Sequence, residues 1–278
     1  MKKFLTGMGI CILVLLLLVG YVAYDDHHIG VTNYEIYSPK LPADFVNYKI
    51  AVIADFHNSY YYDKVVQRIK EQRPDLILFC GDMILLSENN YDNTTKLLDG
   101  INGVAPAYAI TGNHEVFHEK LYQPFLDELA AHKIPLLRNT KTEIVKGNGK
   151  INLYGLQDTI LQDYELYGSK YITNFKNSVK QLDDKSFNLL LMHRANLFPQ
   201  VADCGFDLIV SGHLHGGLIR LPFIGGLVSP YKEWFPKYTS GINYIGQSKM
   251  ITSRGMDYNL QKPRVFNGPE LVMITLKK

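Results

Sequence analysis

The chain has 278 residues, 46% of them hydrophobic and 20% charged, which suits one large globular domain or two small ones. Lys2 and Lys3 account for the whole net charge of +2, so the rest of the chain is formally neutral. A neutral domain lacks the basic surface with which a non-specific nucleic-acid-binding protein displaces counterions, and we expect no nucleic-acid binding.

The chain begins with an apolar segment. Residues 4–24 contain no charged side chain and, as a helix, span about 30 Å, the thickness of a bilayer core. We expect residues 1–24 to form a single-pass membrane anchor, with Lys2 and Lys3 keeping the N-terminus in the cytoplasm. A cleaved signal peptide is the alternative, although residues 20–24 lack a clean pair of small residues before a cut. Both interpretations put the main domain on the extracytoplasmic side of the cell membrane.

Apolar runs then alternate with helical patterns. We expect residues 25–48 to form a linker and an edge strand, and residues 49–278 to form the main domain. The first half of this domain predicts strands over 50–54, 76–80 and 107–111 and helices over 63–72, about 94–101 and 121–132. Such a β-α-β-α series indicates a largely parallel sheet.

The second half has more strands than helices. It predicts a hairpin over 144–154, a helix over 175–182 and strands over 187–192, 208–211, 218–220, 250–253 and 271–276. No Pro-, Gly- or Ser-rich linker divides the chain after residue 48. We therefore expect an α/β (α+β) fold, namely a four-layer α-β-β-α sandwich of two mixed sheets flanked by helices and preceded by one transmembrane helix.

Residues 227–245 mix aromatic side chains with lysines. The aromatic residues are Tyr231, Trp234, Phe235, Tyr238 and Tyr244, and the basic ones are Lys232 and Lys237. We favour a long loop packed over the second sheet, because aromatic side chains are ordinary core material. The alternative is a segment at a membrane interface or over a lipid substrate.

The three cysteines carry little chemistry. Cys11 lies in the apolar start, and no CxxC pair exists, so we expect neither a disulfide framework nor a cysteine-based zinc site. We interpret Cys80 and Cys204 as small buried hydrophobic residues.

Polar residues follow several of the predicted strands. They are Asp55 and His57, then Asp82, then Asn113 and His114, then His193, and finally His213 and His215. Side chains at the carboxyl ends of parallel strands converge on one crevice. We interpret His27, His28, His118 and His132, which lie in no such position, as surface or structural residues.

Carboxylates and imidazoles at these positions are ligands for hard or borderline cations such as manganese, iron and zinc. An isolated Asp or His after a strand is more often a turn residue or a helix cap. Five such motifs in succession are hard to obtain from turn chemistry, so the set indicates a metal site.

The five motifs, D-x-H, GD, GNH[ED], a lone His and GHxH, resemble those of the calcineurin-like metallophosphoesterases and cover residues 55–215. The resemblance implies two divalent ions, Mn²⁺, Fe²⁺ or Zn²⁺. One set of ligands would be Asp55, His57, Asp82 and His215. The other would be Asp82, Asn113, His193 and His213. Asp82 would bridge the ions, and His114 would face the phosphate as the catalytic acid without binding metal.

Residues 212–222 (GHLHGGLIRLP) and 253–255 (SRG) resemble a narrower bacterial branch of membrane-anchored phosphodiesterases, some acting on UDP-diacylglucosamine. The resemblance implies a phosphodiesterase or pyrophosphatase for a phosphoester substrate, possibly lipid-linked. A hydroxide bridging the two metals would attack phosphorus. The alternative is a non-catalytic, metal-stabilised cell-surface binding protein.

Two positions depart from the family pattern. In protein phosphatases of the family an Asp three residues after the GD motif orients the catalytic histidine. Here that position is Leu85, and Glu88 is a candidate substitute. His193 stands in a Met-His-Arg context that is less typical of the lone histidine.

Overall fold

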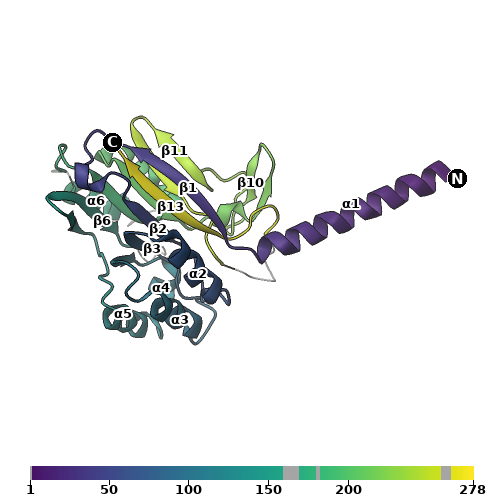
Figure 1. Cartoon of the computed structure of the whole chain (residues 1–278), viewed down its shortest axis with the longest axis horizontal. Helices are drawn as coiled ribbons and strands as arrows, with labels where there is room; N and C mark the ends of the chain where they lie inside the picture. Colours follow the sequence, from purple (N-terminus) through teal and green to yellow (C-terminus); the bar gives the residue numbers. More distant parts are fainter. Residues whose placement is uncertain (1, 159–168, 180–181, 258–263) are drawn as a thin grey trace.

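The computed structural model describes residues 2–158, 169–179, 182–257 and 264–278. Helix α1 (Lys2–Asp26) projects from one end of the folded domain (Figure 1). It is long and apolar enough to cross a bilayer, which makes it a candidate single-pass anchor, and a signal sequence would have the same composition. The helix therefore agrees with the predicted apolar start and extends it to Asp26.

The first sheet has five strands in the order β1-β13-β2-β3-β4. Strand β13 runs parallel to β1 and antiparallel to β2, while β2, β3 and β4 are mutually parallel. The sheet is therefore mixed, and the expected parallel arrangement holds for β2, β3 and β4. The strands are β1 (Gly30–Tyr37), β2 (Lys49–Ile53), β3 (Leu76–Cys80), β4 (Ala107–Ile110) and β13 (Glu270–Lys277).

The second sheet has six strands in the order β11-β12-β8-β7-β6-β5. Its four central strands are parallel, and both edge strands are antiparallel to their neighbours. The strands are β5 (Thr140–Lys146), β6 (Gly149–Leu156), β7 (Asn188–Arg194), β8 (Leu208–Gly212), β11 (Gly241–Ile245) and β12 (Ser248–Thr252).

Three buried apolar clusters define the layers. The central one lies between the sheets and joins Ile50 and Leu78 of the first to Leu153 and Leu191 of the second. A second cluster covers the outer face of the five-stranded sheet with helices α2 (Tyr62–Gln72), α3 (Asp92–Ile101) and α5 (Tyr122–Ala131). A third covers the other sheet with helices α6 (Ser169–Ser178) and α7 (Phe198–Val201). The predicted sandwich of two mixed sheets flanked by helices is confirmed.

Helix α6 lies earlier than the prediction of 175–182 and ends at Ser178, because Ile172 and Phe175 are its buried face on the second sheet. Residues 180–181 of that prediction lie outside the described residues. All three cysteines are free. Cys80 is buried as expected, but Cys204 is only half-buried, because it lies in a short surface turn.

A small two-stranded sheet, β9 (Ile219–Leu221) and β10 (Gly225–Val228), stands beside the second sheet. The interpretation of residues 227–245 as a loop packed over the second sheet is wrong for Trp234 and Phe235, which are 67% and 60% exposed. The reason is that Val228 forms a β-bridge with Trp234, so this segment folds back along β10. Tyr238 does pack on the second sheet's cluster, edge-on against Phe198.

Candidate metal centre

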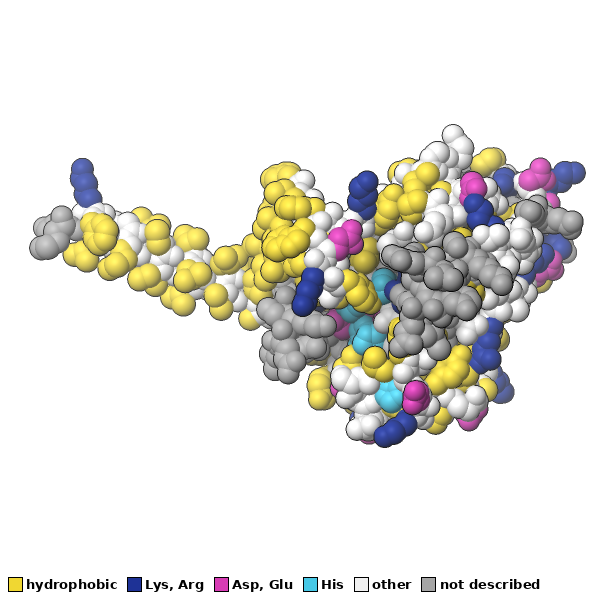
Figure 2. Space-filling model, turned by 180° about the vertical axis from the view of Figure 1, so that it is seen from behind, with side chains coloured by type: hydrophobic (Ala, Val, Ile, Leu, Met, Phe, Trp, Pro, Cys, Tyr) yellow, Lys and Arg dark blue, Asp and Glu magenta, His cyan; other side chains and the backbone are white. Residues whose placement is uncertain are grey.

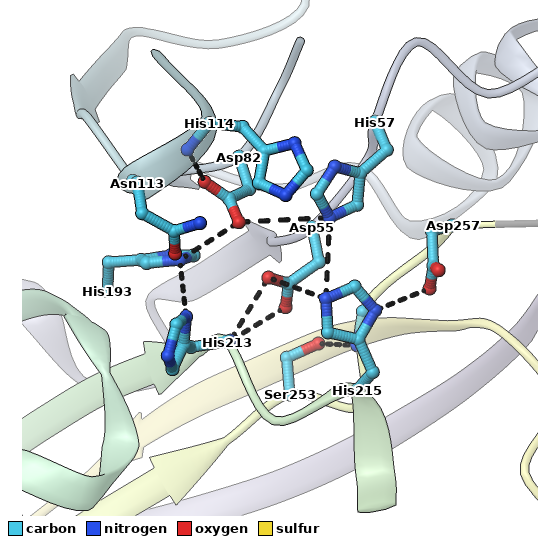
Figure 3. A network of polar contacts seen from close by, with 12 residues as sticks. Asp55, His57, Asp82, Asn113, His114, His193, His213, His215, Ser253 and Asp257 are labelled. Carbon is cyan, nitrogen blue, oxygen red and sulfur yellow. Dashed lines mark hydrogen bonds and ion pairs between the residues drawn. The ribbon is translucent and has the colours of Figure 1, made fainter. Parts of the chain in front are cut away.

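The residues that end the strands of both sheets meet at one edge of the sandwich (Figure 3). Asp55 follows β2, Asp82 follows β3, and Asn113 opens the short helix α4 (Asn113–Phe117) after β4. From the second sheet, His193 lies in β7, and His213 and His215 follow β8. The structure thus brings together all eight residues that the sequence singled out.

One group of side chains consists of Asp55, His57, Asp82 and His215, whose nearest ligand atoms all lie within 4.8 Å of one another. Nε2 of His57 is 3.8 Å from Asp82 Oδ2 and 3.4 Å from His215 Nε2. Nε2 of His215 is 3.7 Å from Asp55 Oδ1. All four side chains are buried, so these nitrogen and oxygen atoms face one another rather than water.

A second group consists of Asp82, His193 and His213, again within 4.8 Å. Nε2 of His193 lies 3.2 Å from Asp82 Oδ2 and 3.1 Å from His213 Nδ1. The side chain of Asn113 points toward the same group (Figure 3). Asp82 belongs to both groups, and a carboxylate with two oxygens is the one residue type here that can serve two cations at once.

Both groups suit divalent cations. Nitrogen and oxygen ligands of one ion stand about 2 Å from it, so they lie a few ångströms from one another, as these do. Carboxylates, imidazoles and amides are ordinary ligands of divalent metal ions. The residues present therefore fit divalent metal ions.

The electrostatics of the second group favour replacement of a proton by a cation. Burial opposes charge on His193, but the Asp82 carboxylate outweighs it and raises the pKa of His193 to about 10. Burial likewise raises the pKa of Asp82, but His193 reverses this and holds it well below its usual range. A carboxylate pressed against a protonated imidazole in a buried site is a position where a metal ion can displace the proton.

His57 and His213 carry no positive charge that would oppose a cation. Burial and the neighbouring His114 lower the pKa of His57 to about 3. Burial and Arg194 lower the pKa of His213 well below its ordinary value. Both imidazoles are therefore neutral at physiological pH, which is the state that binds metal.

The backbone is strained at the same place. Asp55, His57, Asp82, His213 and His215 all have φ between 47° and 77°, the left-handed region. For residues other than glycine this conformation costs roughly 1 kcal/mol or more each, and it persists where a functional arrangement requires it. Five of the seven predicted metal ligands share it, which supports a functional origin.

A buried glutamate that the sequence analysis did not single out holds the loops in place. The carboxylate of Glu115 accepts hydrogen bonds from the backbone N–H groups of Asp82, Met83, Ile84 and Gly112, at 2.6–3.0 Å. These bonds join the loop after β3 to the start of α4. Glu115 is the last residue of the GNHE motif, and this is the feature of the sequence that could have identified it.

Further polar residues orient the histidines. Nδ1 of His193 donates to the carbonyl oxygen of Cys80 at 2.8 Å, which leaves Nε2 facing Asp82. Nδ1 of His215 lies 2.8 Å from Asp257 Oδ1, and Arg264 lies 3.1 Å from the same oxygen. Such outer contacts fix the ring orientation of metal-binding histidines. Asp257 and Arg264 occupy a loop with no motif of their own, so the sequence offered no signal for them.

Arg194 explains the unusual context of His193. Its Nη1 donates to Nε2 of His213 at 2.9 Å, and its Nε lies 2.8 Å from Asp158 Oδ2. Both members of this ion pair are buried. The arginine after His193 thus supports a neighbouring histidine, and its own charge is balanced by Asp158.

A cavity of about 340 Å³ opens onto the site. His57, His114 and His215 form its floor, and Leu86, Phe117 and Tyr231 are among the residues around it. Nδ1 of His114 accepts a hydrogen bond from the backbone N–H of Leu86 at 3.0 Å, while Glu88 accepts one from Asn58 Nδ2 at 2.5 Å. A backbone amide therefore contacts Nδ1 of this histidine.

The remaining histidines lie away from the site. Nε2 of His118 contacts the carbonyl of Glu88, and His132 links α5 to Asp99 of α3. His27 and His28 are exposed at the end of α1. These contacts are structural.

The chain is similar in sequence to several known proteins. The family model for calcineurin-like phosphoesterases matches residues 48–217. An uncharacterized metallophosphoesterase, YkuE of Bacillus subtilis (strain 168), is 28% identical over 93% of this chain and 89% of its own length. Phosphodiesterase YaeI of Escherichia coli (strain K12) is 29% identical, with 82% of each chain covered. UDP-2,3-diacylglucosamine pyrophosphatase LpxG of Chlamydia muridarum (strain MoPn / Nigg) is 21% identical over 85% of each.

Proposed function

Since the chain belongs to the calcineurin-like phosphoesterase family and is a metal-dependent phosphoester hydrolase, we propose that it uses two divalent cations to cleave a phosphodiester or pyrophosphate bond. The observation that carries this proposal is the pair of ligand groups that share Asp82. A single buried carboxylate between two imidazole-rich groups is the arrangement that a dinuclear centre requires.

In this proposal Asp55, His57 and His215 would hold one ion, Asn113, His193 and His213 would hold the other, and Asp82 would serve both. When bound, the two cations supply an activated water and neutralise charge on the phosphate. The chain's own contribution begins with burial. The ligands lie in a largely dry site, where electrostatic interactions are stronger than in water.

His114 is placed to donate a hydrogen bond to the leaving oxygen. Because its Nδ1 accepts from the Leu86 amide, a neutral ring carries its proton on Nε2. The backbone N–H of His114 donates to Asp82 Oδ1 at 2.8 Å, so the histidine is tied to the carboxylate that both ligand groups share. An N–H donor fixed at the edge of the cavity would stabilise the negative charge that develops on the departing oxygen, which then takes its proton from water.

We infer that the substrate is a phosphodiester or pyrophosphate of the cell envelope, with a lipid-linked compound as the leading class. The relatives YaeI and LpxG support diester and pyrophosphate chemistry, and LpxG acts on a diacylated nucleotide sugar by its name. The apolar helix α1 supports an enzyme held at a membrane. Lys2 and Lys3 before it favour a cytoplasmic N-terminus and hence a folded domain on the extracytoplasmic side.

The test is hydrolysis of bis-p-nitrophenyl phosphate by the full chain in detergent, with manganese and with or without a chelator. We expect turnover that the chelator abolishes and that added manganese, iron or zinc restores. Absence of metal-dependent turnover on diesters, pyrophosphates and monoesters alike, by a chain that still binds metal, would favour a non-catalytic binding protein instead.

A further inference from the structure

Exposed apolar side chains gather on one part of the folded domain. Outside α1, the large exposed hydrophobic residues of the described chain are scattered, except that five fall within residues 223–235: Phe223, Ile224, Tyr231, Trp234 and Phe235. Phe223 and Ile224 form the turn of the β9–β10 hairpin, and Phe223 is fully exposed. Single exposed hydrophobic residues need no explanation, but a cluster of aromatic ones does.

The cluster is built on one scaffold. Strands β9 and β10 pair through Gly225 and Leu221, and the backbone N–H of Phe235 donates to the carbonyl of Leu227 at 2.9 Å. The hairpin turn and the segment with Trp234 therefore lie along the same small sheet. We call residues 222–237 the apolar flap. Its two lysines, Lys232 and Lys237, are exposed beside the aromatic residues.

The flap lies next to the point where α1 leaves the domain. Strand β10 is at the end of the domain from which α1 projects (Figure 1), and hydrophobic side chains gather there beside the helix (Figure 2). Named contacts fix this placement. Tyr21 of α1 packs against Phe266 at 5.5 Å between ring centroids, and Asp25 accepts from the backbone of Gly268 at 2.8 Å.

The same C-terminal segment continues to the flap. Val265 forms a bridge with Ile219 of β9, and its carbonyl accepts from the Arg220 backbone at 2.8 Å. If α1 crosses a bilayer, the last turns of the helix set the level of the membrane surface, and this chain of contacts holds the flap near that level.

The flap also forms one wall of the cavity. Pro230 and Tyr231 border the cavity on this side, and the Tyr231 ring stacks on His213 with centroids 4.8 Å apart. The exposed Trp234 and Phe235 therefore follow the cavity wall by only a few residues along the chain.

We propose that the apolar flap is a membrane-docking surface that inserts its aromatic side chains into the bilayer carrying α1 and holds the cavity mouth at headgroup level. Tryptophan and tyrosine favour the interface between headgroups and acyl chains. Exposed lysines beside them attract anionic headgroups. This goes beyond the hydrolase chemistry proposed above, and docking is tested without reference to activity.

Trp234 is the chain's single tryptophan, so its fluorescence reports on the flap alone. The full chain is reconstituted through α1 into liposomes of equal parts phosphatidylcholine and phosphatidylglycerol. We expect blue-shifted emission, quenching by phosphatidylcholine brominated in its acyl chains, and protection from aqueous iodide. Emission typical of water, quenched by iodide and not by brominated lipid, would overturn the proposal.

The matched control moves the reporter to the far side of the domain. A Trp234→Phe, Val145→Trp chain carries its tryptophan at an exposed position on β5, whose partner β6 lies away from α1 (Figure 1). We expect this reporter to respond to iodide and not to brominated lipid. Equal quenching of both reporters by brominated lipid would also overturn the proposal, because it would show non-specific adsorption.

A second variant tests the hairpin turn. Replacing Phe223 and Ile224 by Ser removes exposed side chains, so the folded domain should unfold at an unchanged temperature. We expect loss of Trp234 quenching and slower hydrolysis of a vesicle-borne phosphodiester, with unchanged hydrolysis of the soluble one. If the variant hydrolysed both substrates at the wild-type rates, the proposal that the flap holds the cavity at the membrane would be overturned. A wild-type chain that docks but cleaves neither substrate would count against the proposed hydrolase alone.

Discussion

The backbone N–H of Leu86 donates a hydrogen bond to Nδ1 of His114 over 3.0 Å. Leu86 follows Leu85, which stands where protein phosphatases of the family have the Asp that orients the corresponding histidine. An amide N–H cannot accept a proton, so this contact puts the proton of a neutral ring on Nε2, whereas a carboxylate at Nδ1 would hold it on Nδ1.

The first prediction concerns His114. Replacement by Ala is expected to lower kcat by about a hundredfold or more while metal content stays unchanged, because a hydrogen-bond donor to the leaving oxygen is lost and no ligand is removed. The loss should be larger for an alkyl phosphodiester than for a p-nitrophenyl one, since p-nitrophenolate needs less stabilisation of its negative charge. Steady-state kinetics on both esters, with metal analysis, make the measurement. Normal rates in the variant would remove His114 from the mechanism.

The second prediction concerns Asp82. Replacement by Ala is expected to abolish binding of both metal ions and all turnover, since this carboxylate belongs to both ligand groups. Metal analysis of the purified chain measures it. The control is Asp203→Ala, which removes a surface carboxylate paired with Lys176 and should change neither property. Retention of a full complement of metal by the Asp82 variant contradicts the shared-carboxylate arrangement.

The third prediction concerns Gly81. It has φ +84°, and a Cβ there would lie 2.6 Å from the Gly112 backbone nitrogen and 2.7 Å from His193 Nδ1. Gly81→Ala is therefore expected to displace His193, weaken metal binding and lower the free energy of unfolding by more than about 1 kcal/mol. Gly103→Ala is the control, with φ +77° and open space around it. Equal effects of the two substitutions on metal binding would show that backbone strain alone is responsible.

The fourth prediction concerns the buried pair of Arg194 and Asp158, whose side chains are 6% and 3% exposed. Asp158→Asn leaves the arginine charge buried without its partner, and we expect the free energy of unfolding to fall by about 3–5 kcal/mol. The double replacement Asp158→Asn with Arg194→Gln should lower the free energy of unfolding by less than the sum of the two single replacements. Denaturant unfolding of the four chains measures this coupling, and strict additivity would show that the pair does not act as a unit.

The fifth prediction concerns pH and lies far from the metal centre. Burial opposes charge on His132, but its hydrogen bond with Asp99 and its contacts with Glu128 outweigh this and raise its pKa above the ordinary 6.5. A raised pKa in the folded state stabilises the protein below pH 6.5, and the stabilisation is lost as pH rises through the folded-state pKa. The unfolding free energies of wild type and His132→Gln should therefore differ below pH 6.5 and converge at alkaline pH. A constant difference would show that the charge on His132 plays no part.

Much of the fold could be predicted because its strands are short buried apolar runs with clear ends. Strand β3 (Leu76–Cys80) lies over the predicted residues 76–80 for this reason. Strands β10 and β11 were missed, since they contain Gly225, Gly226 and Gly241 and bury little. The place of β13 between β1 and β2, parallel to the first and antiparallel to the second, depends on pairing between distant parts of the chain, which no local pattern reveals.

The residues of the candidate site fall into two groups, those that a sequence motif identifies and those that no motif identifies. The candidate metal ligands stand at or just after strand ends in short motifs, so they could be named from the sequence. The residues that hold them, such as Asp257 and Arg194, act through contacts that only the folded chain creates. The aromatic residues near Trp234 were assigned to the core because composition alone does not distinguish a packed loop from an exposed one.

The position of β13 has a consequence for biosynthesis. This strand, made last, fills the gap between β1 and β2, which are made first. Synthesis must therefore reach β13 before the first sheet can close. Until then the edges of β1 and β2 stay open to proteases and chaperones. A nascent chain stalled before Glu270 should accordingly remain sensitive to protease, and release of the last nine residues should complete the protected domain.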